Sequence, residues 1–253
     1  MVVSWINLLA RMSDQGRELT PVECALLAHR AEVDLAGGAG GQMDQYATAV
    51  GGLLFQSFHP ETRVEPLPGK LGAFVLGDSE TQKDTQAILS RVKERVTALV
   101  ASVRHRHPEF SLHTIPAGEI DDCLAVLAGP DRAFLRATLR NREITREGRE
   151  LLMQPRPDAG ALGAMLDEQH SILGGTLGIS TPKIDGMLEA ARRAGAAGGK
   201  INGSGGGGCM FACVPDAPDR AAAVAAAITT GGGRAFVVTV DEGTRSETPE
   251  EEG

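Results

Sequence analysis

The chemistry that this sequence could perform is concentrated in two glycine-rich segments. One of them lies between two runs that are typical of strands, residues 200–202 and 209–214. Its residues are Gly203, Ser204, Gly205, Gly206, Gly207 and Gly208. Glycine inside a strand or helix costs about 0.5–1 kcal/mol relative to alanine, so four in succession indicate positive φ or a close backbone approach. A flexible linker would have polar flanks. Close approach to a phosphate, or to a loop that carries one, is favoured over a structural glycine hairpin.

The other glycine-rich segment, residues 35–46, presents a carboxylate. Four of its residues are glycines, and Asp44 follows them at or near the start of a short helix. Two interpretations stand side by side. Asp44 could cap this helix or complement its dipole. Alternatively, the glycines let the backbone present the carboxylate to a ligand.

Neither segment matches the common nucleotide-binding fingerprints. The glycine run does not end in Gly-Lys-Ser/Thr. It also does not lie between a strand and a helix with an acidic residue at the right distance further along the chain. The four cysteines show no metal-ligand spacing, so no metal ligand is predicted and reduced thiols of a cytoplasmic protein are favoured over disulfides. They are Cys24, Cys123, Cys209 and Cys213.

Helices and strands must position these segments. Thr20, Pro21 and Glu23 supply an N-cap, a proline in the first turn and a capping-box acid, so a helix is expected from there to about residue 33. Apolar residues four apart predict an amphipathic helix over residues 84–103, and Thr181-Pro182 opens another that ends at Gly195. Further helices are expected over residues 1–12, 119–128, 131–153, 161–173 and 217–228, strands over 53–58, 71–77 and 234–240, and a proline-containing turn over 65–69.

Composition narrows the partners. The 253 residues suffice for a large core, and 42% hydrophobic residues with only 4% aromatic ones fit an aliphatic core in an α+β protein. Apolar runs fall far short of about 20 residues, and the N-terminus lacks the basic opening of a signal peptide, so no membrane span is predicted. A net charge of −8 disfavours nucleic acid. We therefore expect a small-molecule substrate.

Longer stretches resemble one known family. Residues 40–52 resemble the Gly-x-Met-Asp-Gln segment of galactokinases, and residues 200–214 are similar to the third signature motif of the GHMP kinase superfamily. That superfamily includes galactokinase, homoserine kinase, mevalonate kinase and phosphomevalonate kinase. Residues 77–96 and 166–200 resemble the family's intervening segments, in the family's order.

The resemblance implies a kinase that moves the γ-phosphoryl group of ATP, with Mg²⁺, to a sugar hydroxyl. Asp44 would accept or orient the proton of that hydroxyl. Gly41, Gln42 and Gln45 would bind the substrate, and the loop of residues 203–208 would support the nucleotide phosphates. His170 and Ser171 fall in the family's Ser/Asn-His-x-Ser-Leu stretch and would support the site, although a histidine buried with hydrogen-bond partners is an equally ordinary core residue. Phosphoryl transfer relies on positioning and charge stabilisation, for which these residue types suffice.

The resemblance also implies an incomplete GHMP kinase fold. The family's Gly-Glu-His-x-Asp motif and its Gly-Leu-Ser-Ser-Ser phosphate motif are not found, and residues 1–11 resemble the helix that follows the serine run. The expected organisation is a remnant of the N-terminal nucleotide and substrate domain over residues 1–60. A GHMP kinase C-terminal domain of the ferredoxin-like α+β type follows over 61–240, and an acidic, disordered tail over 241–253.

Three functions stay open on these residues. The first is a galactokinase-like sugar kinase. The second is a mevalonate-type kinase, because the Gly203–Gly208 loop also resembles that of mevalonate kinases and the galactokinase tyrosine after residue 79 is replaced by Ile88-Leu89-Ser90-Arg91. The third is a non-catalytic relative. The oligomeric state is not predicted.

Overall fold

The structure is a computed structural model that describes residues 1–14, 16–38, 40–82, 85–217 and 219–245. The chain divides into two compact units, Met1–Pro68 with Val240–Gly253, and Gly69–Thr239. We call them unit 1 and unit 2. The domain boundaries predicted at residues 60 and 240 stay predictions. Residues 246–253, most of the predicted disordered tail, and residue 84, the predicted start of one helix, lie outside the described residues.

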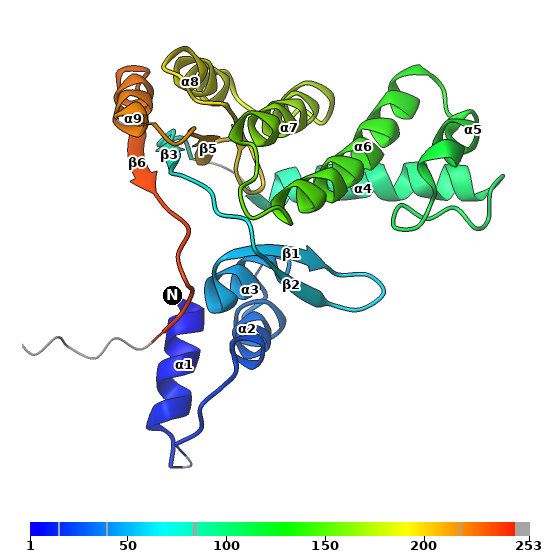
Figure 1. Ribbon diagram of the computed structural model, residues 1–253. Helices are drawn as coiled ribbons and strands as arrows, with labels where there is room; N and C mark the ends of the chain where they lie inside the picture. The colour runs from blue at the N-terminus through cyan, green and yellow to red at the C-terminus, as the bar shows by residue number, and fades with distance from the viewer. Residues whose placement is uncertain (15, 39, 83–84, 218, 246–253) are drawn as a thin grey trace, which may run out of the picture. The chain divides into compact units, whose positions relative to one another are not determined.

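Unit 1 joins three α-helices, a π-helical turn and a hairpin (Figure 1). Its elements are α1 (Val2–Met12), α2 (Pro21–His29), η1 (Arg30–Leu35), α3 (Met43–Val50), β1 (Leu53–Ser57) and β2 (Arg63–Leu67). The predicted capping box is present: Thr20 accepts from the Glu23 N–H, and the Glu23 carboxylate accepts from the Thr20 N–H. A small core lies where the helices meet, formed by Val3, Cys24, Ala25, Ala28, Tyr46 and Ala49.

Strand β2 corrects the turn predicted over residues 65–69. It pairs antiparallel with β1, and Pro66 lies opposite Leu54. Proline lacks the N–H that a central strand would donate, but both strands of a two-stranded sheet are edge strands, where proline is tolerated.

Unit 2 contains the larger sheet and the remaining helices. Its elements are β3 (Phe74–Asp78), α4 (Thr85–Arg104), η2 (Ala117–Glu119), α5 (Ile120–Leu124), α6 (Gly129–Leu152), α7 (Ala159–Ser171), η3 (Ile172–Thr176), α8 (Pro182–Arg193), β4 (Gly198–Ile201), β5 (Cys209–Cys213), α9 (Arg220–Thr230) and β6 (Arg234–Val238). The sheet has the order β4-β5-β3-β6 with antiparallel pairs throughout. Taken with α8 and α9, this is the ferredoxin-like arrangement, and the predicted α+β class is confirmed.

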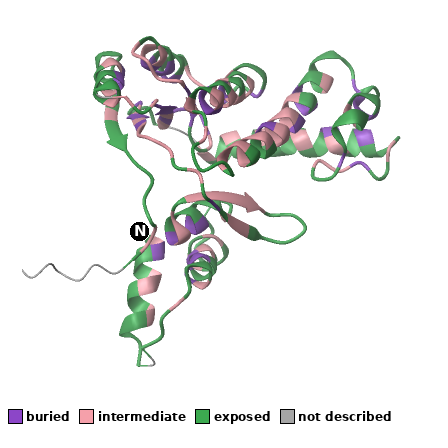
Figure 2. Cartoon of the chain, viewed as in Figure 1, coloured by how far each residue is buried: buried purple, intermediate pink, exposed green. Residues whose placement is uncertain are grey.

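Two cores stabilise unit 2, visible as purple segments in Figure 2. In one, the helices α8 and α9 pack on the sheet through Met187, Ile228 and Val75, among other buried residues. In the other, α4, α5 and α6 enclose Leu124, Leu135 and further apolar side chains. No helix among the described residues has both the length and the apolar character of a membrane span.

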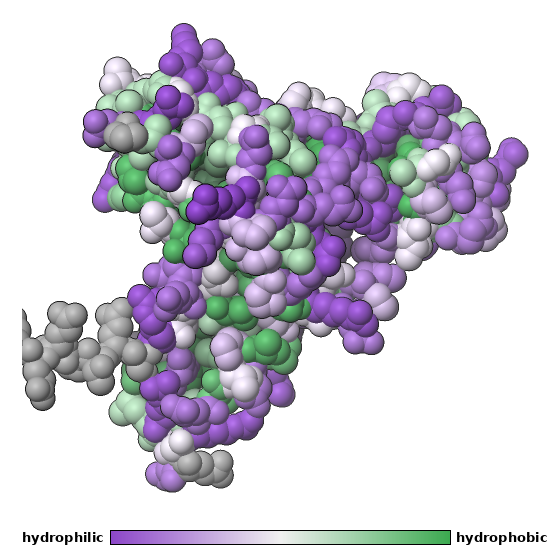
Figure 3. Space-filling model, in the orientation of Figure 1, coloured by the Kyte–Doolittle hydropathy of each residue, from purple (hydrophilic) through white to green (hydrophobic). Residues whose placement is uncertain are grey.

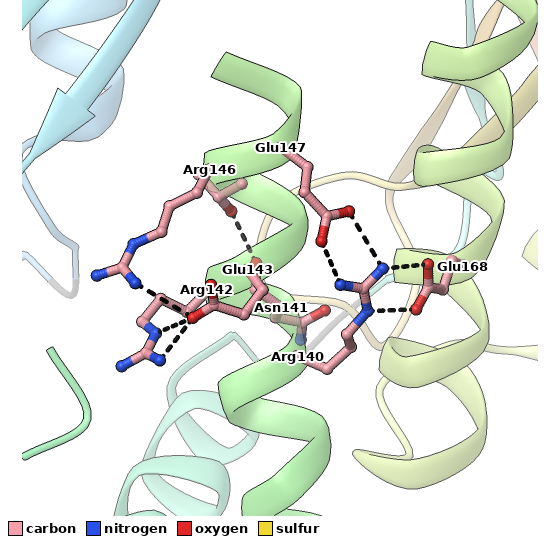
Figure 4. A network of polar contacts seen from close by, with 8 residues as sticks. Arg140, Asn141, Arg142, Glu143, Arg146, Glu147 and Glu168 are labelled. Atoms are coloured by element: carbon pink, nitrogen blue, oxygen red, sulfur yellow. Dashed lines mark hydrogen bonds and ion pairs between the residues drawn. The ribbon is translucent and has the colours of Figure 1, made fainter. Parts of the chain in front are cut away.

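Charged side chains fasten α6 to its neighbours (Figure 4). Arg140 binds Glu147 on its own helix and Glu168 on α7, with Nε 2.6 Å from Glu168 Oε1. Arg142 donates to the carbonyl oxygens of Leu112 and Ile115 at 2.8 Å each. These contacts attach α7 and the loop after α4 to one long helix.

Candidate active site

Asp44 lies in the first turn of α3 and lines a cavity in unit 1. The N-cap position belongs to Gln42, whose side chain makes no capping bond, so the N-cap interpretation of Asp44 is not supported. The Asp44 carboxylate nevertheless lies in the first turn of the helix, where it complements the helix dipole. The cavity has a volume of about 220 Å³ and is lined by Met1, Val2, Val3, Glu32, Asp44, Gln45 and Thr48.

Gln45 gives this cavity an unused hydrogen-bond acceptor. Its side chain is buried, and its amide nitrogen donates to Glu32 Oε2 at 2.9 Å. Within the described residues, the other end of the amide, Oε1, is buried without a hydrogen-bond partner. A buried polar atom without a partner costs about 1–3 kcal/mol, so the protein retains a costly unpaired acceptor on a residue that lines the cavity.

The other two predicted substrate residues do not line the cavity. Gln42 accepts a hydrogen bond from Thr62 Oγ1 at 3.0 Å. Gly41 is exposed, and a side chain there would meet nothing within 4 Å. Glu32 does line the cavity, although it was not predicted. Its only sequence signal is an acid a few residues before the glycine-rich segment.

The loop of residues 203–208 in unit 2 adopts the conformation that glycine permits. Gly203, Gly205, Gly206, Gly207 and Gly208 have φ between 69° and 132°. A Cβ on Gly205 would lie 2.4 Å from the Ile179 carbonyl oxygen, and one on Gly207 would lie 2.8 Å from that of Thr81. The predicted close approach therefore exists, and it is partly an approach to the protein's own backbone.

Some amides of this loop have partners and others do not. The Gly206 N–H donates to Ile179 O at 2.7 Å, and the Gly208 N–H donates to Thr81 O at 3.2 Å. In the described part of the chain, the N–H groups of Ser204, Gly205 and Gly207 have no hydrogen-bond acceptor. Unpaired backbone donors in this partly buried loop favour an acceptor such as a phosphate oxygen.

The start of α4 lies beside this loop. The hydroxyl of Ser204 donates to Thr85 Oγ1 at 3.3 Å, and Thr85 begins α4. A helix N-terminus carries partial positive charge, so it adds to the attraction that the loop amides exert on an anion.

No cluster of three or more His, Cys, Asp or Glu side chains that could hold a metal ion is present among the described residues. None of the four cysteines forms a disulfide within the part of the chain that the structure describes. Asp44 belongs to unit 1 and the glycine loop to unit 2, so their shared role stays a prediction.

Comparisons with known proteins identify relatives of this arrangement. Residues 149–233 match the family model for the C-terminal region of GHMP kinases. The chain is 32% identical to the mevalonate kinase of Pyrococcus horikoshii over 215 residues, which is 85% of this chain and 54% of that protein. It is 26% identical to the galactokinase of Enterococcus faecalis over 206 residues, 77% of this chain and 51% of that protein.

The fold has counterparts among solved structures. Lactococcus lactis galactokinase, solved in complex with galactose, superposes with a TM-score of 0.75 over 96% of this chain and 64% of that chain. The sequence identity is 17%, so this likeness concerns the fold alone. The chain spans about half the length of the curated relatives that it matches.

Proposed function

The chain belongs to the GHMP kinase superfamily, and from this premise we propose that it forms part of an ATP-dependent kinase that phosphorylates a hydroxyl of mevalonate. The observation that carries the proposal is the cavity lined by both Asp44, an exposed carboxylate, and Gln45, whose buried Oε1 has no partner among the described residues. Both are acceptors, as a site for a substrate hydroxyl requires. Mevalonate is favoured over a sugar because the mevalonate kinase relative has 32% identity and the galactokinase relative 26%.

The proposed roles follow from the chemistry of each group. Asp44 accepts the proton of the attacking hydroxyl, and Gln45 Oε1 accepts a hydrogen bond that orients the substrate. The unpaired amides of Ser204, Gly205 and Gly207 bind phosphate oxygens or the loop that holds them. ATP would supply the phosphoryl group, and Mg²⁺ would offset its charge. Asp44 and Glu32 are the cavity's carboxylates, the ligand type that Mg²⁺ prefers.

A sugar kinase is the second candidate. It is supported by the galactokinase-like segment around Asp44 and by the fold shared with the Lactococcus galactokinase. The two candidates make the same use of Asp44 and the glycine loop, so they differ only in the hydroxyl compound that is bound.

A turnover assay tests the proposal. The protein is assayed with ATP, Mg²⁺ and either R-mevalonate or galactose, both as residues 1–253 and within the longest reading frame that contains them. We expect kcat/KM for mevalonate to exceed that for galactose at least about tenfold, a difference of about 1.4 kcal/mol in transition-state binding. Preference for galactose would establish the sugar kinase instead. No turnover of either compound by the longer protein would contradict both.

A further inference from the structure

The glycine loop is held by two hydrogen bonds, one from the strand before it and one from within it. Directly before the loop, the Ile201 N–H at the end of β4 donates to His170 Nδ1 at 3.2 Å. Within the loop, the Gly206 N–H donates to the Ile179 carbonyl oxygen at 2.7 Å. His170 lies in the last turn of α7 and Ile179 precedes α8, so two separate segments of unit 2 hold the loop.

Asp185 on α8 connects these two attachments. Its Oδ1 lies 3.1 Å from His170 Nε2 and also accepts the Ser180 hydroxyl at 2.5 Å. Ser180 is the residue after Ile179. One carboxylate oxygen therefore fixes the imidazole that binds Ile201 and the turn that binds Gly206.

The hydrogen bonds define the tautomer of His170. Nδ1 accepts the Ile201 N–H and so carries no proton, which leaves the proton on Nε2, where it is donated to Asp185. His170 is buried, and burial lowers its pKa, although Asp185 and Asp167 oppose the shift and Arg192 adds to it. The neutral ring is thus the form present at neutral pH.

We propose that His170, oriented by Asp185, is a positioning residue that holds the Gly203–Gly208 loop in the shape that receives the nucleotide phosphates. The nucleotide part rests on the proposed kinase function, whereas the control of the loop by His170 does not. A histidine that only fills the core would leave the loop amides unaffected by its protonation. Protonation of Nδ1 removes the acceptor of Ile201, so the loop should loosen as the pH falls.

Two substitutions each remove one of the two hydrogen bonds that the His170 ring makes, to Ile201 or to Asp185. In His170→Asn, the amide oxygen can replace Nδ1 as acceptor for Ile201 while the bond to Asp185 is lost. In His170→Gln, the amide nitrogen can replace Nε2 as donor to Asp185 while the bond to Ile201 is lost. His105→Gln is the matched control, because His105 is an exposed histidine of unit 2 that directly follows α4.

Amide hydrogen exchange of residues 1–253, followed by NMR, measures directly how well the loop amides are protected by their hydrogen bonds. We expect exchange at Ile201 to be about five- to tenfold faster in His170→Gln than in the wild-type chain, because one hydrogen bond of about 1 kcal/mol is lost. In His170→Asn, exchange at Ile201 should stay within about twofold of wild type while exchange at Gly206 accelerates, since Asp185 loses one partner. Unchanged exchange at both amides in both variants would overturn the proposal.

The pH dependence of amide exchange in the wild-type protein is a second test, and it does not require a His170 variant to fold. Exchange at Ile201, corrected for intrinsic rate, should accelerate below a midpoint that coincides with the imidazole titration seen in the ¹⁵N shifts of His170. Asp185→Asn keeps an oxygen for Ser180 and Nε2 but removes the charge that favours the imidazolium, so the midpoint should move to lower pH. A midpoint that does not move, or no midpoint, would contradict the assignment.

The kinase readout distinguishes the two levels of the proposal. In an active protein, His170→Gln should raise the KM for ATP about fivefold with less than about twofold change in kcat, while His105→Gln leaves both unchanged. Exchange effects without any kinase activity would retain the positioning role and reject the kinase function. An active enzyme in which His170→Gln changes neither the amide exchange of the loop nor the KM for ATP would reject the positioning role alone.

Discussion

Asp44 and Gln45 are adjacent in sequence, and the structure gives them complementary tasks. Asp44 is exposed and accessible to a substrate proton, whereas Gln45 is buried and fixed by its bond to Glu32. Consecutive residues of a helix point about 100° apart, so both can line one cavity only because it wraps around the start of α3. The proposed division is a proton acceptor beside a rigid orienting group.

Replacing Asp44 by asparagine tests the first of these tasks. Asparagine keeps the size and much of the hydrogen bonding but removes the negative charge and the basicity. Because general-base contributions are typically 10²–10⁴-fold, kcat should fall by about that factor, with little change in the KM for ATP. Steady-state kinetics of the longest active protein, together with its melting temperature, measure both effects.

Asp34→Asn is the matched control for that substitution. Asp34 is an exposed acid of η1 that does not line the cavity. It should therefore keep wild-type turnover. If Asp44 served only the dipole of α3, its asparagine variant would lose a few tenths of a kcal/mol of stability and would keep its kcat. Unchanged kcat would remove Asp44 from the mechanism.

Helix α7 meets strand β4 through a contact that only small residues allow. Gly163 on α7 and Gly198 on β4 touch backbone to backbone, and a Cβ on Gly163 would lie 2.3 Å from the carbonyl carbon of Ala197. This packing places His170, at the end of α7, against Ile201. The geometry of the glycine loop thus depends on how closely the two elements approach.

Gly163→Ala should therefore destabilise unit 2. The added methyl group must displace backbone, and overpacking of this kind costs about 1–3 kcal/mol. Gly148→Ala on α6 is the opposite case, since a side chain there meets nothing within 4 Å and alanine is the better helix former by about 1 kcal/mol. Urea unfolding of the two variants should move the midpoint in opposite directions; equal midpoints would refute the packing argument.

Local signals predicted some elements well and others poorly. The Thr20 and Thr181 caps defined helix starts because a cap is read from a few neighbouring residues. Strand β2 was missed because Pro66 indicates a turn, and only its pairing with Leu54 shows that it lies on an edge. Glu32 and the His170–Asp185 pair were equally inaccessible, since their partners come from distant segments and no residue spacing encodes the contact.

For the molecule as a whole, the described surface of unit 1 carries much apolar area. Large hydrophobic side chains of α1 and of Met1 before it are exposed, and green hydrophobic surface is visible over unit 1 in Figure 3. They are Met1, Trp5, Leu8, Leu9 and Met12. In unit 2, α8 and α9 bury residues of β3, β4 and β5, whereas Phe236, Val237 and Val238 of β6 are exposed. Two buried groups of unit 2, His170 and Cys213, have pKa values shifted by burial, so their ionisation makes stability depend on pH.

Cys213 and His170 should define the two ends of a plateau in stability. Burial raises the pKa of the Cys213 thiol to about 11 from 9.0, so between these values the unfolded chain binds fewer protons than the folded one. Stability should then fall with rising pH, by about 2–3 kcal/mol in all. Burial lowers the pKa of His170 from 6.5, so below 6.5 the unfolded chain binds more protons and stability falls as the pH decreases.

Urea unfolding from pH 5 to 11 tests this plateau, with one variant for the alkaline decline in stability and one for the acid decline. Cys213→Ala removes the thiol and should flatten the alkaline decline, although it lowers stability at pH 8 by the packing that the sulfur provided. His170→Asn removes the imidazole and should weaken the acid decline while leaving the alkaline one intact. The two declines arise from different groups in different elements, Cys213 in β5 and His170 in α7. The effects of the two substitutions on the free energy of unfolding should therefore add in the double variant. An alkaline decline that persists in Cys213→Ala would assign it to another group.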